Sequence, residues 1–330
     1  MLSGIMIGVI TVAFVFNFIS GFHDTANAIA TAVYTKALTP DKAILLAACM
    51  NLAGAMVSEK VAMTISSGIV NIALEQHVIL AALIGAVIWN LITWWLAIPS
   101  SSSHALIGSL IGATIVYSRS AGTIIWSGVI KKVVIPLFTS PLIGFVIGFF
   151  FMKMIFNIFA NWSQNKVNKT FLKAQLFSSA LVAYSHGSND AQKTMGIITL
   201  ALISGGVLNS TAGVPFWVKV ACAATMALGT FTGGKRIMKT MGGGMTKLEP
   251  SSGFVAQTAS ALVIEAMTFF GIPVSTTQVI TTSIMGAGSA KRVSSVKWGI
   301  ARNILFAWII TLPVSMAFGG GFCWLIDLFV

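Results

Sequence analysis

The sequence predicts an all-α polytopic membrane protein with two inverted-topology repeats, broken helices and hydroxyl-tipped helical hairpins. Three observations lead to this fold class: an apolar composition, apolar runs of membrane-spanning length, and two pairs of matching motifs. Of 330 residues, 56% are hydrophobic and 8% are charged, whereas a soluble domain is about 25% charged. A soluble core cannot absorb this much apolar surface, so we expect the chain to lie in the lipid bilayer.

The apolar runs have the length of membrane-spanning helices, which is about 20 residues. They are continuous rather than alternating, which argues against the strands of a membrane β-barrel and leaves α-helices to satisfy the backbone in lipid. Gly21, His23 and Asp24 interrupt the first run, so we expect that helix to break or thin there. The runs fall at 5–33, 43–63, 78–98, 104–118, 133–156, 174–204, 214–233, 253–271, 274–288 and 303–329.

Two pairs of matching motifs indicate an internal repeat. Residues 21–27 and 187–193 each place an aspartate in a glycine-flanked and otherwise apolar setting. Residues 99–113 and 273–287 each begin with a proline that is closely followed by a run of hydroxyl side chains. The chain therefore divides into a first transmembrane repeat, a polar linker and a second transmembrane repeat, at residues 1–156, 157–173 and 174–330.

The basic residues predict how the chain faces the membrane. The net charge is +12, but its lysines and arginines are spread through loops, which argues against a nucleic-acid partner. Most of them lie in loops that crossing parity puts on one side, at 34–42, 157–173, 234–249 and 289–302. The positive-inside rule makes that side cytoplasmic. The two aspartate-bearing helices then run in opposite directions, so the repeats are inverted, as in many transporters.

The two proline-hydroxyl segments predict a binding site for an oxyanion. Proline ends the preceding helix and a Ser or Thr caps the next one, which begins with unpaired N–H groups and a positive dipole end. Such a helix start suits a tetrahedral oxyanion; the alternative is that the hydroxyls bond only to their own helix. The hydroxyl donors are Ser101, Ser102, Ser103, Ser275, Thr276 and Thr277.

The aspartates predict that a cation or a proton accompanies the anion, because two carboxylates would otherwise repel it. In the first motif Asp24 has Thr25 and Asn27 nearby, whose oxygens suit a hard cation such as Na⁺. In the second motif Asp190 has Lys193 at i+3, a neighbouring position on a helix. Lys193 is then a fixed internal cation, a group that faces the anion, or half of a structural ion pair.

Three histidines lie near these motifs, and one further interpretation is a proton relay through them, because histidine titrates near neutrality. They are His23, His104 and His186. Capping or packing roles are the alternative. We expect no catalytic residue and no resident cofactor, only co-transported H⁺ or Na⁺.

The motifs resemble those of the inorganic phosphate transporter (Pit-type) family, and in particular its branch of bacterial low-affinity phosphate permeases. The resemblance rests on residues 21–31, 99–104, 185–193 and 273–277. It implies a multi-pass protein of the bacterial cytoplasmic membrane that carries one phosphate with a symported cation by alternating access. It assigns phosphate and cation contacts to Asp24, Thr25, Asn27, Ser101–Ser103, Asn189, Asp190 and Ser275–Thr277.

The sequence departs from the family pattern at a few positions. Members usually have histidine where Gln278 stands, and animal relatives carry glutamates where Asn51 and Gln257 stand. Lys193 replaces the asparagine of a fully symmetric motif. With Gln278 in place of the histidine, a proton relay would have to use His104. Lys193, Asn51 and Gln257 favour protons, or a neutral metal–phosphate complex, over several sodium ions.

We therefore expect a secondary active phosphate:cation symporter, with H⁺ or Na⁺ as the cation, and not an enzyme. Alternatives are a transporter of another oxyanion such as sulfate, a phosphate-permeable channel, and a membrane enzyme acting on lipid phosphates. Phosphate can donate a hydrogen bond to Asp24 or Asp190 and sulfate at pH 7 cannot, which favours phosphate. The internal repeat argues against the enzyme. A homodimer is one assembly that these observations allow.

Overall fold

A computed structural model of the chain describes residues 4–209, 211–232 and 246–329, with the backbone but not the side chains of residues 25–27. The described part is predominantly helical, as the sequence predicts. Its helices are α1 Gly4–Tyr34, α2 Pro40–Ala55, α3 Lys60–Ser67, α4 Gln76–Trp95, α5 Ser102–Ser118, α6 Trp126–Val129, α7 Ile135–Ile158, α8 Gln164–Ser204, α9 Phe216–Thr232, α11 Pro250–Phe269, α12 Thr276–Lys291 and α13 Trp298–Asp327. Short 3-10 turns lie at Ala121–Thr123 and Val293–Ser295, and a π-helical segment, Ile130–Val134, joins α6 to α7.

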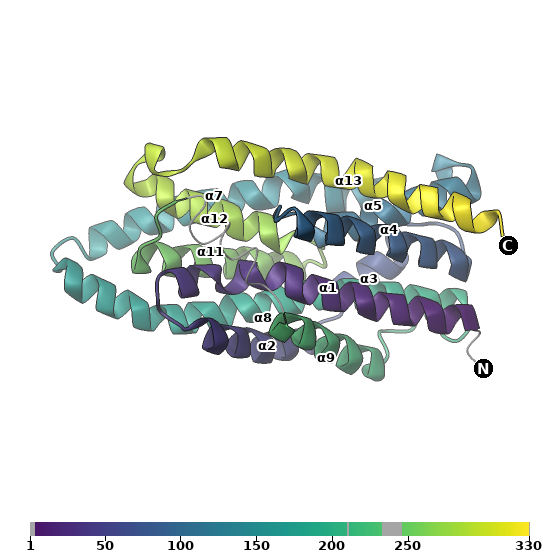
Figure 1. Cartoon of the computed structure of the whole chain (residues 1–330), viewed down its shortest axis with the longest axis horizontal. Helices are drawn as coiled ribbons and strands as arrows, with labels where there is room; N and C mark the ends of the chain where they lie inside the picture. The colour runs from purple at the N-terminus through teal and green to yellow at the C-terminus, as the bar shows by residue number, and fades with distance from the viewer. Residues whose placement is uncertain (1–3, 210, 233–245, 330) are drawn as a thin grey trace.

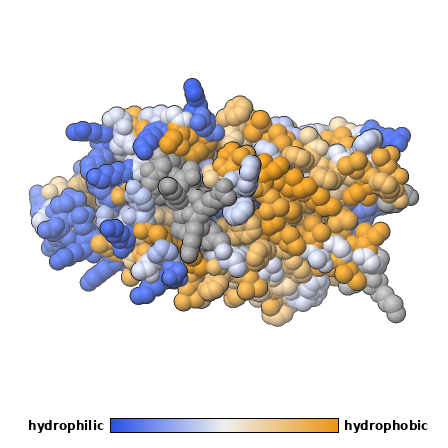
Figure 2. All heavy atoms as spheres, viewed as in Figure 1, coloured by the Kyte–Doolittle hydropathy of each residue, from blue (hydrophilic) through white to orange (hydrophobic). Residues whose placement is uncertain are grey.

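The helices form an elongated bundle that is suited to a membrane. Most run along its length, and both termini lie at one end (Figure 1). Hydrophilic residues gather at the opposite end, and a broad hydrophobic belt covers much of the rest of the face shown in Figure 2. Among the described residues, α1, α4, the α6–α7 run and α13 are long and apolar enough to cross a membrane, and the α2–α3 pair adds a fifth candidate span. The prediction of a polytopic α-helical membrane protein is confirmed.

Helix α1 runs through the first aspartate motif without a break, so the break expected there is wrong. A glycine inside a helix costs only about 1 kcal/mol. At Gly21 a side chain would collide with the backbone of α9, so the absence of a Cβ lets α9 pack closely against α1. The Asp24 carboxylate is satisfied by hydrogen bonds from other segments. Helix α8 likewise continues through the second motif.

The chain is interrupted elsewhere. Helices α2 and α3 meet at a bend of 66°. Helix α8 begins at Gln164, so much of the predicted polar linker is helical.

The first proline-hydroxyl segment forms a tight helical hairpin between α4 and α5. After α4 ends, Ala97 adopts a left-handed conformation with φ 54°. An extended stretch leads to Ser101, the N-cap of α5, whose hydroxyl accepts a hydrogen bond from the backbone N–H of His104 at 3.2 Å. The N-cap preference of serine therefore sets where α5 begins, deep inside the bundle.

The second hairpin, between α11 and α12, repeats this geometry. Gly271 occupies the position of Ala97, with φ 65°. Ser275 is the N-cap of α12 and accepts from the backbone N–H of Gln278 at 3.3 Å. Both predicted hydroxyl-tipped hairpins are therefore present, and their helix starts point into the centre of the bundle.

The packing of the helices follows the same duplication. Helix α1 packs against α4 and α9, while α8 packs against α11 and α2. Helix α5 packs against α13, and α12 packs against α7. Exchanging the two halves of the chain maps each of these pairs onto another, which is what two equivalent repeats would produce. The repeat boundaries themselves stay a prediction.

Candidate functional site

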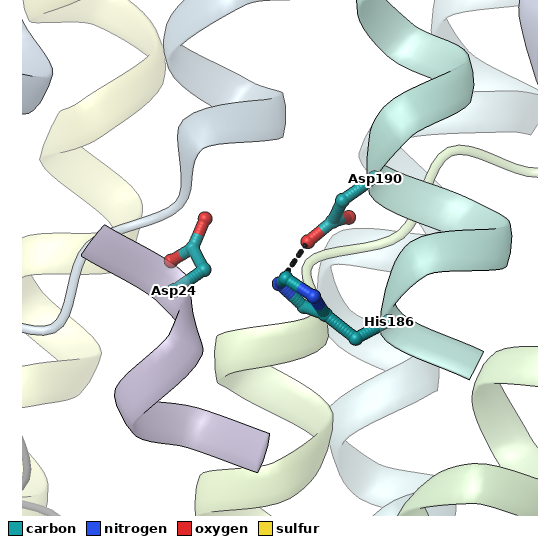
Figure 3. A group of neighbouring side chains, drawn as sticks. All are labelled: Asp24, His186 and Asp190. Carbon is teal, nitrogen blue, oxygen red and sulfur yellow. Dashed lines mark ion pairs between the residues drawn. The ribbon is translucent and has the colours of Figure 1, made fainter. Parts of the chain in front are cut away.

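The two hairpin tips meet two buried aspartates at the centre of the bundle. Asp24 on α1 is 2% exposed and Asp190 on α8 is 6% exposed. Ligand atoms of Asp24, Asp190 and His186 lie within 4.8 Å of one another, and Figure 3 shows Asp24 opposite the pair that Asp190 forms with the histidine ring. Because burying an ionised carboxylate is costly unless it is paired and hydrogen-bonded, the partners of each one define the site.

Asp24 accepts hydrogen bonds from both hairpin tips. Ser102 Oγ, from the first tip, donates to Asp24 Oδ2 at 2.7 Å. Thr277 Oγ1, from the second tip, donates to Asp24 Oδ1 at 3.1 Å. His23 Nδ1 lies 3.1 Å from Oδ1. Helix α1 is thus tied to both hairpins through one carboxylate.

Asp190 has a matching hydroxyl donor and, in addition, a lysine. Thr276 Oγ1 donates to Asp190 Oδ2 at 2.7 Å, and Lys193 Nζ donates to Oδ1. His186 Nε2 lies 3.0 Å from Oδ2, the contact drawn as a dashed line in Figure 3. Asp190 therefore belongs to a compact group on α8 that reaches the second tip.

Lys193 extends this group to the first tip as well. Its ammonium group donates to Ser103 Oγ and, at 2.9 Å, to the backbone carbonyl of Val274. Ser103 Oγ itself donates to the same carbonyl at 3.0 Å. The lysine is 2% exposed, so its charge is balanced by protein oxygens rather than by water.

An amide that the sequence patterns did not assign to the site holds His186 in place. His186 Nδ1 lies 3.1 Å from Asn51 Oδ1, and Asn51 Nδ2 donates to Thr230 Oγ1 at 2.8 Å. Two signals were available: a lone amide in the middle of the apolar run 43–63, and the glutamate that animal relatives carry at this position.

Comparison with known proteins identifies the family. A family model described as "Phosphate transporter family" matches residues 20–319. The chain belongs to this family. It is 49% identical over 314 residues to a "Probable low-affinity inorganic phosphate transporter" of Bacillus subtilis (strain 168), covering 94% of each chain. A relative of the same description from Rhizobium meliloti (strain 1021) is 46% identical, over 94% of this chain and 93% of the relative.

A solved structure agrees with this membership. The chain resembles "The sodium-dependent phosphate transporter" with a TM-score of 0.91 and 25% identity, covering 99% of this chain and 100% of the other. The family resemblance drawn from the motifs is confirmed, and relatives named as transporters agree with the expectation that the chain is not an enzyme. The bacterial relatives and the spanning helices agree with a multi-pass protein of a bacterial cytoplasmic membrane.

The structure gives the remaining predicted site residues other contacts than the two aspartates, or does not describe their side chains. Ser101 and Ser275 use their hydroxyls as helix caps. Asn189 Nδ2 donates to Thr268 Oγ1 at 2.8 Å and to a backbone carbonyl at the start of the second tip. The side chains of Thr25 and Asn27 lie outside the described residues, so the Na⁺ site at Asp24 and Asn27 stays a prediction.

The proton relay also stays a prediction. His23 and His186 each lie beside one aspartate. His104 is in the first turn of α5, and its Nδ1 has no hydrogen-bond partner among the described residues.

Proposed function

We propose that the chain is a secondary active transporter that carries inorganic phosphate together with a cation, H⁺ or Na⁺, by alternating access. The observation that carries the proposal is the convergence of both hydroxyl tips on two buried carboxylates. Membership of the phosphate transporter family supports the substrate. The anion, the cation and the conformational change are each supported by a different part of the site.

The anion site is supported by two helix starts that face each other. The first turns of α5 and α12 present backbone N–H groups and the positive ends of two helix dipoles. Ser102, Thr276 and Thr277 add hydroxyl groups that can turn from a carboxylate to a phosphate oxygen. Ser103 adds a fourth, which here donates to the backbone carbonyl of Val274. A phosphate that keeps one proton can in return donate to Asp24 or Asp190, which favours phosphate over sulfate.

Cation coupling is supported by the charges of the site. Asp24 and Asp190 carry two negative charges against the single positive charge of Lys193, as long as the imidazoles are neutral. Adding a phosphate anion to this buried group without a cation would be strongly unfavourable. The close contact of His186 with Asp190 favours a proton, while the likeness to a structure titled as sodium-dependent favours Na⁺.

Alternating access is supported by the burial of the site and the duplication of the bundle. Asp24, Asp190, Lys193 and the four hydroxyl residues are each 6% exposed or less, so this conformation is closed toward both membrane faces. Phosphate can enter and leave only after helices separate. Rocking one half of the bundle against the other around the central site would open it to one side at a time.

Uptake of labelled phosphate by proteoliposomes tests the proposal. A sodium gradient and a pH gradient are imposed separately, and excess sulfate serves as a competitor. We expect saturable uptake driven by one of the gradients and inhibited more by phosphate than by sulfate. Uptake that needs no cation gradient and does not saturate would point to a channel, and equal inhibition by sulfate would overturn the substrate.

The same assay tests the two carboxylates. A hydrogen bond to a charged group contributes about 1.5–3 kcal/mol, and each change also removes a negative charge on which the proposed cation coupling depends. We therefore expect Asp24→Asn and Asp190→Asn each to lower uptake by about 100-fold or more. Gel filtration of each variant in detergent checks that it is folded. Near-normal uptake by either folded variant would contradict the proposed coupling.

A further inference from the structure

We propose that the Lys193 ammonium group is a built-in cation, which fills a cation site in the second half of the molecule. With this site filled by the protein, each transport cycle carries one cation fewer than it would with a small neutral residue at position 193. This inference rests on the proposed phosphate:cation symport and specifies its stoichiometry. Three features of the structure support it.

The first feature is the set of atoms around the ammonium group. Lys193 Nζ donates to a carboxylate oxygen of Asp190, to the hydroxyl of Ser103 and to the carbonyl of Val274. Carboxylate, hydroxyl and backbone carbonyl oxygens are the ligands that a hard cation takes in proteins. They come from α8 and from both hairpin tips, so they converge only in the folded molecule.

The second feature is a comparison of the two halves. Ser102 donates to Asp24 and Thr276 donates to Asp190, both at 2.7 Å, so these contacts correspond. The next residue of the second tip, Thr277, donates directly to Asp24. On the other side, the ammonium group of Lys193 donates to both Ser103 and Asp190 and so bridges the corresponding pair. A positive charge therefore lies between a hydroxyl and a carboxylate that would otherwise face each other.

The third feature is the hydrogen-bonding capacity of lysine. An ammonium group has three N–H donors and no acceptor, and here three protein oxygens receive them. In this closed conformation no donor is left for a phosphate anion. The ammonium group thus satisfies the second carboxylate in place of a coupled ion, and a role as an anion ligand would require it to leave Asp190.

The test uses variants that differ in size at position 193. Lys193→Ala and Lys193→Asn leave the Asp190, Ser103 and Val274 oxygens in place and open space beside them. Lys193→Met fills that space with an uncharged chain and serves as the matched control. Phosphate uptake by proteoliposomes is measured with choline, Li⁺ or Na⁺ outside, at fixed membrane potential and with the same pH gradient.

The alanine and asparagine variants should acquire a requirement for a small cation. We expect their uptake in choline to be low and to rise by about tenfold or more with saturating Na⁺ or Li⁺, while the methionine variant stays low throughout. The charge moved per phosphate, measured from reversal potentials, should rise by one relative to the wild-type protein. In detergent, Na⁺ should raise the melting temperature of Lys193→Ala more than that of the wild-type protein, because ligand binding to the folded state stabilises it.

Two results would overturn the inference. One is the same cation response in Lys193→Ala and Lys193→Met; the other is an alanine variant that Na⁺ does not stabilise beyond the wild-type protein. If neither small variant folds, the uptake rate of the wild-type protein is measured against the concentration of the coupling cation. A first-order dependence supports the inference, and a second-order dependence overturns it. Failure of the proposed function looks different, because the wild-type protein would then show no gradient-driven uptake, while the melting experiment would still report on the cation site.

Discussion

At the residue scale, the two aspartates are held by hydroxyl groups whose role is chemical rather than steric. Thr276 and Asp190 are both buried, and the bond between them is 2.7 Å long. A hydrogen bond to a charged group contributes about 1.5–3 kcal/mol, and leaving a buried acceptor unpaired costs a similar amount. The hydroxyl of each tip residue is therefore expected to matter more than its methyl group.

Replacing Thr276 tests this expectation. Valine has nearly the same shape but cannot donate, so Thr276→Val should lower the melting temperature in detergent and weaken phosphate uptake by about 10-fold or more, given a loss of about 1.5–3 kcal/mol. Thr276→Ser should keep most of the uptake. Thr258→Val is the control on α11, because that hydroxyl bonds only to its own helix, at Phe254 O. Equal behaviour of the two valine variants would show that the Asp190 contact is unimportant.

The sequence allowed the site residues to be predicted as a group but not their individual contacts. Paired aspartates and paired hydroxyl runs are costly to bury in an apolar chain, so their presence there indicates a polar site. Which hydroxyl caps a helix and which reaches a carboxylate depends on where each helix starts, and a shift of one residue would exchange Ser101 and Ser102. Asn51 was noted as a departure from the animal relatives but was not assigned to the site, because a single amide in an apolar run has many ordinary structural roles.

At the element scale, both hairpins contain a turn with a left-handed backbone, but only the second has glycine, the residue that adopts this conformation most easily. Ala97 and Gly271 both have left-handed backbones, with φ of 54° and 65°. This conformation costs a non-glycine residue about 1–2 kcal/mol. Ala97→Gly should therefore raise the free energy of unfolding by up to about 1 kcal/mol, after the entropy that glycine loses on folding.

The reverse change should be harmful in the second hairpin. In Gly271→Ala the new Cβ would meet the strain of the positive φ and would also lie 3.0 Å from the backbone carbonyl of Lys60. We expect a melting temperature below that of the wild-type protein, whereas Ala97→Gly should melt above it. Thermal unfolding in one detergent compares the three proteins, and a shift of both variants in the same direction would contradict the shared turn geometry.

The prediction of elements succeeded where a local signal exists and failed where packing decides. Proline and serine mark the start of each hairpin, and apolar length marks the spans. The expected break in α1 was wrong because no local signal reports that α9 packs on Gly21 or that two distant hydroxyls satisfy Asp24.

At the scale of the whole molecule, the distribution of hydrophilic and basic residues indicates which end of the bundle faces the cytoplasm. The end of α5 lies near both the start of α4 and the C-terminal end of α13, through the contacts Tyr117–Glu75 and His77–Asp327. Figure 1 places the turn between α7 and α8 at the opposite end, where the hydrophilic surface of Figure 2 gathers. Because basic loops remain in the cytoplasm, that hydrophilic end is expected to face the cytoplasm and both termini to face outward.

Labelling of single cysteines tests this orientation. Cys49, Cys222 and Cys323 are first replaced by serine or alanine, and one cysteine is then introduced at an exposed loop position, Ser120 or Asn161. An impermeant maleimide should label Ser120→Cys in intact cells, because that loop lies at the end with the termini. Asn161→Cys, between α7 and α8, should react only after the membrane is permeabilised. Labelling of Asn161→Cys in intact cells would show that the orientation is the reverse of the one expected, and that the Asp24 helix enters the membrane from the other side. Equal phosphate uptake by the two variants is the control that each is correctly assembled.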